Sequence, residues 1–229
     1  MDWTRPIDAY CERLGPGLWA EPLNAATNAA FFLAALVALV LARRAGRLDG
    51  PVVALTALTA VIGTGSLLFH SFATVWAALA DTTPIMLFIL GYFAVAMHRF
   101  AAIGWGRAVL LTLGLFAAMA ALSAAMKAVA GPFLGGSESY LPAFAALLGV
   151  GLWLRRRRHP AGAWLLAAAA TFAVSLTFRT ADGPLCDVWP VGTHFVWHLL
   201  NGVVLGTLLV ALIRHGGAPR HLAGLARIA

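Results

Sequence analysis

The chain consists of seven long apolar stretches separated by short polar segments. A run of about 20 apolar residues is long enough to cross a bilayer as a helix, and a helix satisfies all of its backbone hydrogen bonds internally. We therefore predict an all-α fold, a seven-transmembrane helix bundle. The predicted spans are Ala25–Ala42, Val52–Phe69, Val75–Met97, Arg107–Met126, Tyr140–Leu154, Ala161–Phe178 and Val191–Ile213, with an alternative start for the fifth span near Leu134.

Composition agrees with this pattern. Of the 229 residues, 61% are hydrophobic and 11% are charged, whereas a soluble domain carries about 25% charged residues. We divide the chain into an extramembrane N-terminal segment (1–24), a seven-helix membrane domain (25–213) and a cytoplasmic tail (214–229). An ordinary soluble protein is excluded.

The net charge of +7 does not indicate a nucleic-acid partner, because the basic residues lie in the short loops. Twelve of the sixteen fall on one side of the predicted bundle, as the positive-inside rule requires of the cytoplasmic side. The N terminus is therefore expected outside and the C terminus in the cytoplasm. The bias towards Ala and Arg favours a bacterial inner membrane, with the outer end of the bundle facing the periplasm.

Polar residues inside membrane helices are costly and usually functional. His194 and His198 are spaced i, i+4 and share one helix face, and Ser66 and His70 have the same spacing on the second span. Asp81 lies one to two turns into the third span. In the predicted topology these five residues lie at similar depth near the outer end, whereas the remaining histidines lie at the inner end: His98, His159, His215 and His221.

Three imidazoles with a nearby carboxylate favour a catalytic zinc site, because neutral histidine is the commonest zinc ligand and three of them leave a fourth position for water. The alternative for each histidine is a hydrogen bond to a neighbouring helix. Likewise, Ser66 follows Gly63 and Gly65 and could simply serve close helix packing.

Several segments resemble the alkaline ceramidase family, which belongs to a superfamily of seven-span membrane hydrolases that also includes the adiponectin receptors. The similar segments are Gly65-Ser66-Leu67-Leu68-Phe69-His70, Asp81-Thr82-Thr83-Pro84-Ile85-Met86, Gly192-Thr193-His194-Phe195-Val196-Trp197-His198, Tyr10-Cys11-Glu12 and Trp19-Ala20-Glu21-Pro22-Leu23-Asn24. The resemblance covers about residues 8–201.

This resemblance implies a zinc-dependent intramembrane amidase that hydrolyses ceramide to a sphingoid base and a fatty acid. By the same resemblance, His70, His194 and His198 hold zinc, Asp81 is the acid/base, and Ser66 stabilises the developing oxyanion. Other readings stay open: another acyl lipid as substrate, a lipid sensor with structural zinc, or a proton or metal transporter. The sequence leaves the oligomeric state open.

The resemblance also implies a calcium site in the N-terminal segment, with Asp8, Glu12 and Glu21 as candidate ligands. The chain departs from the family pattern here, because its aspartate stands three residues before the cysteine instead of two and the intervening tryptophan is missing.

Other polar residues belong to the predicted outer side. Cys11 and Cys186 both fall there, where an oxidising compartment would allow a disulfide; two unpaired thiols are the alternative. Arg179 and Asp182 follow the predicted end of the sixth span, where we expect an interfacial ion pair or a head-group contact.

Overall fold

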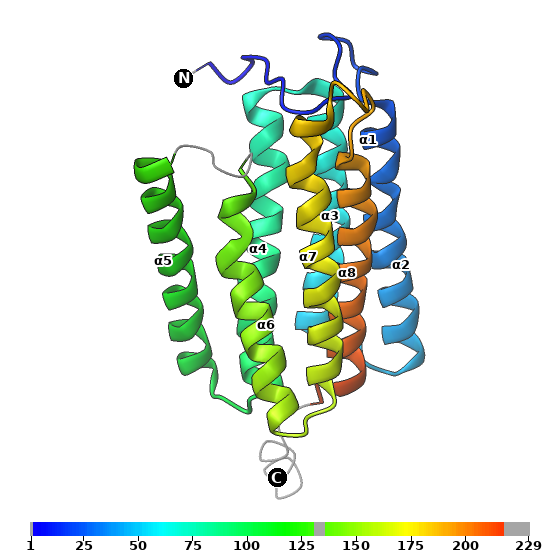
Figure 1. Ribbon diagram of the computed structural model, residues 1–229. Helices are drawn as coiled ribbons and strands as arrows, with labels where there is room; N and C mark the ends of the chain where they lie inside the picture. Colours follow the sequence, from blue (N-terminus) through cyan, green and yellow to red (C-terminus); the bar gives the residue numbers. More distant parts are fainter. Residues whose placement is uncertain (1, 131–135, 218–229) are drawn as a thin grey trace, which may run out of the picture.

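The computed structural model describes residues 2–130 and 136–217, and within these ranges it is all-helical (Figure 1). Seven spans are long and apolar enough to cross a membrane, which confirms the predicted fold class. The first span is formed by α1 (Pro22–Thr27) and α2 (Ala29–Arg44), followed by α3 (Gly50–Phe72), α4 (Val75–Arg99), α5 (Trp105–Ala130), η1 (Ser137–Tyr140) with α6 (Leu141–Arg156), α7 (Ala161–Leu185) and α8 (His194–His215). The alternative start near Leu134 and residues 218–229 of the tail lie outside the described residues.

The sixth span is longer than predicted, since α7 continues beyond Phe178 to Leu185. Arg179 and Asp182 are therefore helix residues and not loop residues. The prediction was wrong because it treated charged side chains as the end of an apolar run. Asp182 is buried against the backbone of α8, so the bundle itself compensates the polarity of that side chain.

The bundle is built around α3 and α8, the two spans with the largest buried share. Helix α3 packs against α4 and α2, whereas α8 packs against α7 and α2. Helix α5 lies at the edge, beside α4 and α6 (Figure 1). The core between the inner helices contains fully buried apolar side chains, among them Ile62, Phe88, Leu165 and Leu209.

Two residues explain the close approach of α3 to α4. Pro84 lies inside α4 and has no N–H, so the Ala80 carbonyl four residues earlier loses its helical partner. Gly65 of α3 lies directly against this carbonyl, and a Cβ at position 65 would collide with it. The glycine thus permits backbone contact beside Asp81, as small residues do between membrane helices.

The end of the bundle near Phe72, Leu185 and His194 is called the upper end here, and the N-terminal segment runs across it (Figure 1). Backbone hydrogen bonds attach this segment to the α3–α4 turn: Ile7 N–H donates to Ala73 O at 2.7 Å, and Val75 N–H donates to Arg5 O at 3.2 Å. The segment therefore covers the upper end of the bundle.

A salt bridge joins helix ends at the opposite end of the bundle, which is called the lower end. Asp49 caps α3 by accepting a hydrogen bond from Val52 N–H, and the same carboxylate binds Arg99 at the end of α4 at 2.7 Å. Arg99 also donates to the carbonyl of Gly216, just after α8. Three helix ends are thereby joined.

The α3–α4 contact yields a prediction. Substitution Gly65→Ala should lower the thermal unfolding temperature of the detergent-solubilised protein, because overpacking typically costs about 1–3 kcal/mol. It should also reduce activity, since Ser66 and Asp81 adjoin the contact. Gly91→Ala is the matched control in α4, because a Cβ there meets only Leu55 Cδ2 at 3.5 Å. Equal unfolding temperatures for the two variants would contradict the prediction.

Candidate metal centre and adjoining cavity

Three histidines from two helices meet near the upper end of the bundle. His70 lies in the last turn of α3, His194 is the first residue of α8, and His198 follows one turn later. One ring nitrogen from each lies within 4.8 Å of the other two. All three side chains are buried, with exposed fractions of 1–2%. This geometry can hold one metal ion.

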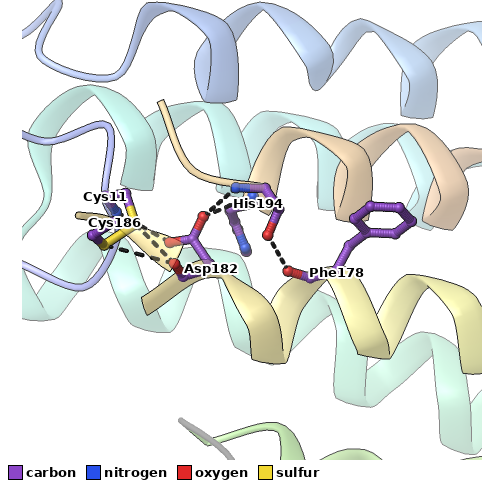
Figure 2. The surroundings of a disulfide bond; sticks show 6 residues. Cys11, Phe178, Asp182, Cys186 and His194 are labelled. Atoms are coloured by element: carbon purple, nitrogen blue, oxygen red, sulfur yellow. Dashed lines mark hydrogen bonds between the residues drawn. A yellow bond between two sulfur atoms is a disulfide. The ribbon is translucent and has the colours of Figure 1, made fainter. Parts of the chain in front are cut away.

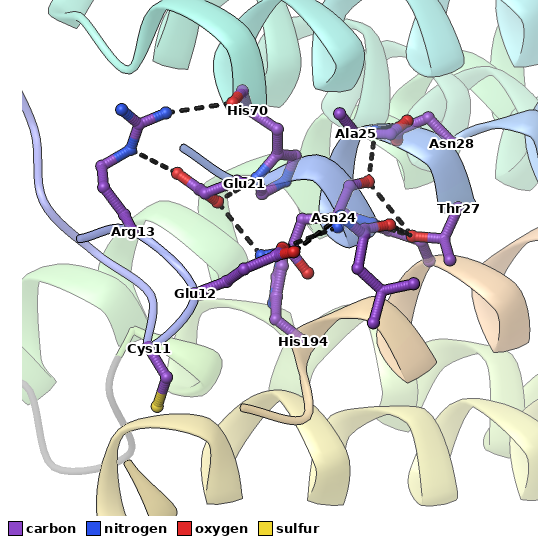
Figure 3. A network of polar contacts seen from close by, with 12 residues as sticks. Cys11, Glu12, Arg13, Glu21, Asn24, Ala25, Thr27, Asn28, His70 and His194 are labelled. Carbon is purple, nitrogen blue, oxygen red and sulfur yellow. Dashed lines mark hydrogen bonds and ion pairs between the residues drawn. The ribbon is translucent and has the colours of Figure 1, made fainter. Parts of the chain in front are cut away.

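His70 is oriented by a buried carboxylate. Its Nδ1 lies 2.6 Å from Glu21 Oε2 (Figure 3), and an ionised carboxylate can only accept, so Nδ1 donates. Burial alone would raise the pKa of Glu21, but hydrogen bonds from His70, Arg13 and Asn24 hold that pKa below its ordinary value. The other nitrogen, Nε2, is buried and has no hydrogen-bond partner among the described residues. A carboxylate–histidine pair of this kind fixes the tautomer of a metal ligand.

His198 is oriented by the break between α1 and α2. Its Nδ1 lies 3.1 Å from the Thr27 hydroxyl. That hydroxyl has one proton, which it donates to the carbonyl of Leu23 at 2.8 Å or of Asn24 at 3.1 Å. The hydroxyl oxygen therefore accepts from His198, which leaves Nε2 of His198 available to a ligand.

Two contacts, one from the N-terminal segment and one from α7, fix His194. The Tyr10 ring stacks on its imidazole with centroids 3.6 Å apart. Asp182 Oδ1 accepts the backbone N–H groups of Thr193 at 2.6 Å and His194 at 2.9 Å (Figure 2). A carboxylate at a helix N-terminus satisfies free donors and complements the helix dipole, so Asp182 of α7 caps α8 where the histidine begins.

The N-terminal segment is joined covalently to the same place. Cys11 and Cys186 form a disulfide, with their Cα atoms 5.2 Å apart (Figure 2). Oδ2 of Asp182 accepts the backbone N–H of Cys11 at 3.1 Å. The disulfide and the carboxylate thus hold Tyr10 over His194.

Below the histidines lies an apolar cavity. Ser66, Asp81 and His198 line one end of it, and the side chains of Ser66 and Asp81 interact. Asp81 Oδ1 is buried without a hydrogen-bond partner within the described ranges. The remaining lining comes mostly from α4, α6 and α8 and includes Ile85, Phe88, Ala146, Val150, Leu205 and Leu208. The cavity thus joins a polar head to an apolar body.

Aromatic rings and an arginine flank the polar head of the cavity. Tyr140 and Trp197 both line it. The guanidinium of Arg179 lies 5.6 Å from the centroid of each ring and donates to Ser137 Oγ at 3.0 Å. This places a half-buried cation near Asp81.

The three candidate calcium ligands do not assemble into a site, and the structure gives the calcium hypothesis no support. Glu12 accepts the N–H groups of Leu23 at 2.6 Å and Asn24 at 2.8 Å and so caps α1. Glu21 binds other side chains, and Asp8 is exposed. Within the described part of the chain, the three histidines are the sole group of at least three His, Cys, Asp or Glu residues with metal-binding geometry.

Several residues that hold the site were not predicted from the sequence: Tyr10, Arg13 and Thr27, together with the capping role of Asp182. Tyr10, Arg13 and Thr27 lie far along the chain from the histidines they contact, and Asp182 lies on the helix before His194, so regular helical spacing gives no signal. A carboxylate close to the end of a long apolar run is a sequence signal that could have indicated a role for Asp182.

Fold and site define a multi-pass membrane protein with a buried histidine cluster above an apolar cavity. The family model described as Ceramidase matches residues 10–218, which include all seven spans, and the chain belongs to this family. Membership makes the protein an amide-bond hydrolase that acts on ceramide, a membrane lipid. No curated protein matches the chain.

The capping contact of Asp182 yields a prediction. In Asp182→Asn one carboxylate oxygen becomes an NH₂ group facing a backbone N–H. Loss of this bonding to a buried group costs about 1–3 kcal/mol, so both the unfolding temperature and the metal affinity of the protein should fall. Asp187→Asn is the control, because Asp187 is exposed in the turn after α7. Metal-chelator competition and thermal unfolding provide the readouts, and an Asp182→Asn protein that behaves like the control would refute the role of the cap.

Proposed function

We propose that the protein is a zinc-dependent intramembrane ceramidase, with His70, His194 and His198 as zinc ligands. The observation that carries this proposal is the convergence of three buried histidine nitrogens at the polar head of an apolar cavity. Family membership indicates the reaction, and the histidine cluster is the group of side chains that would bind the zinc ion.

The donor set fits zinc. Three imidazole nitrogens with one open position are a common catalytic arrangement for this ion. Nε2 of His70 and Nδ1 of His194 are buried without hydrogen-bond partners among the described residues, and unpartnered buried polar atoms are costly unless something binds them. Among the residues that the structure describes, the group consists of the three histidines without a carboxylate, which favours an open catalytic site over the closed four-ligand site of a structural zinc.

Zinc bound there would polarise a carbonyl group and make water acidic enough to lose a proton near neutral pH. Asp81 is our candidate for the proton carrier: Oδ1 takes the proton from water and later delivers it to the leaving amide nitrogen. Ser66 Oγ donates a hydrogen bond to the carbonyl oxygen as negative charge develops on it. Tyr140 and Trp197 exclude bulk water from the head of the cavity.

The cavity suits a ceramide. Its polar head lies beside Asp81 and His198, and its apolar lining continues along α8 to Leu208. Ten residues of helix correspond to roughly 15 Å, which gives room for a long alkyl chain. Beyond the polar head the lining is mostly apolar, with Asn201 and Tyr92 as its polar members, and the Tyr92 hydroxyl donates to the backbone carbonyl of Leu208. This sparse polar lining favours an alkyl chain over a transported ion.

We place the upper end of the bundle outside and the lower end in the cytoplasm, for two reasons. The helices that end at the lower end carry basic residues in their last turns, as α2 and α6 do, which matches the positive-inside rule. The disulfide lies at the upper end, where an oxidising compartment would maintain it. In a bacterial inner membrane that compartment is the periplasm. In this arrangement residues 1–24 are extramembrane and residues 214–229 form the cytoplasmic tail.

Loss of a zinc ligand tests the proposal. His198→Ala should reduce fatty-acid release from a ceramide panel by more than about 100-fold, because even outer partners of a metal ligand are worth about 10–100-fold. Zinc content per protein, measured by elemental analysis, should fall with it. His98→Ala is the control, since His98 lies at the lower end and stacks on Trp105. Zinc-loaded wild type that releases no fatty acid from any ceramide would refute the ceramidase function.

The cavity lining predicts chain-length selectivity. Ala146→Phe should shift activity towards ceramides with shorter acyl chains, because Ala146 lines the cavity and the new ring fills it. Ala145→Phe places the same ring on an exposed position of the same helix and should leave the preference unchanged. Release rates across a series of acyl chains compare the two variants. An identical preference in both would show that the acyl chain does not occupy this cavity.

A further inference from the structure

Arg13 is a buried arginine whose contacts all lie beside the histidine cluster. Its side chain is only 5% exposed. Nε donates to Glu21 Oε1 at 2.5 Å, one terminal nitrogen donates to the carbonyl of Gly15 at 3.1 Å, and the other donates to the carbonyl of His70 at 3.0 Å (Figure 3). Figure 3 shows the guanidinium between the N-terminal segment and the end of α3.

These partners form an oxygen-lined place for a cation. One carboxylate oxygen and two backbone carbonyl oxygens, from three separate points of the chain, face the guanidinium. Oxygen donors of this kind are the ligands of hard cations such as calcium. Here a side chain of the protein itself occupies the position.

The Arg13 guanidinium is connected to His70 by two sets of hydrogen bonds. It binds Glu21, whose other carboxylate oxygen accepts from Nδ1 of His70 at 2.6 Å, and it binds the backbone carbonyl of His70 itself. Glu21 is only 1% exposed, and a buried carboxylate without a compensating partner is strongly unfavourable. The planar fork of an arginine suits several fixed acceptors at once.

We propose that Arg13 is the built-in cation of this site: it positions His70 through Glu21 and takes the place of a calcium ion, so that the protein needs none. This rests on the proposed function, since His70 must hold zinc for its position to matter. Arg13 is a positioning residue and takes no part in the chemistry. The same pairing explains why Glu21 is not free to bind calcium, since its carboxylate already binds Arg13 and His70.

The test compares Arg13→Gln and Arg13→Lys with wild type and with Arg5→Leu, a control at an exposed arginine of the same segment. The full-length protein in detergent is stripped of metal and titrated with zinc against a chelator in calcium-depleted buffer. The titration is repeated with millimolar calcium, and binding of radioactive calcium to each protein is measured directly.

Arg13→Gln should weaken zinc binding by about 10–100-fold, the usual cost of losing a partner that orients a metal ligand. Arg13→Lys keeps the positive charge beside Glu21 but loses the planar fork, so it should bind zinc more weakly than wild type and more tightly than Arg13→Gln. Added calcium should strengthen zinc binding in Arg13→Gln, where the oxygen-lined place is vacated, and should leave wild type and Arg5→Leu unchanged. A merely structural role would not produce this rescue by calcium.

The proposal would be overturned if the wild type bound calcium. It would also be overturned if Arg13→Gln bound zinc as tightly as the wild type does. Calcium that leaves folded Arg13→Gln unaffected would show that the three oxygens do not form a cation site. If Arg13→Gln does not fold, Arg13→Lys and the wild-type calcium measurement decide: the proposal requires Arg13→Lys to bind zinc less tightly than wild type by no more than about 10-fold, and the wild type to bind no calcium. A wild type that binds no zinc would refute the proposed function separately, while the calcium measurements would still test the cation site.

Discussion

A cluster of three buried imidazoles within an apolar bundle has to be held by polar groups that are themselves satisfied. Unpaired polar atoms are expensive in a low-dielectric interior, and here each histidine has a separate set of partners. Glu21 holds His70, Thr27 holds His198, and Asp182 with Tyr10 holds His194. The architecture of the upper end follows from this requirement, because its N-terminal segment, helix break and disulfide all supply or fix one of these partners.

The N-terminal segment is consequently part of the site. Although it contains no long helix, it contributes Tyr10 and Arg13 and is joined to α7 through Cys11. Backbone hydrogen bonds at Ile7 and Val75 tie it to the α3–α4 turn. Its placement closes the polar end of the bundle above the cavity, which concentrates the polar groups in one layer and leaves apolar side chains below them.

That separation suits the chemistry of a ceramidase, whose substrate is itself polar at one end and apolar along its chains. Asp81 and Ser66 lie where the two regions meet, beside His198. Gly65 and Pro84 produce this arrangement locally, because the missing side chain and the freed carbonyl of Ala80 bring α3 and α4 into backbone contact next to both residues. The helix contact and the proposed catalytic residues thus share the same few positions.

The sequence by itself determined the seven spans, the depth of the polar residues and the pairing of histidines on shared helix faces, because apolar length and i, i+4 spacing are local properties. It also indicated that His70, Asp81 and His198 belong to one end of the bundle. It did not determine that α7 continues to Leu185, because charged residues within a span are tolerated only where a neighbouring helix compensates them. The partners Arg13, Thr27 and Asp182 likewise depended on tertiary structure, since Arg13 and Thr27 reach their histidines across long stretches of chain and Asp182 reaches the start of α8 from a different helix. Only folding decides which distant donor faces which buried acceptor.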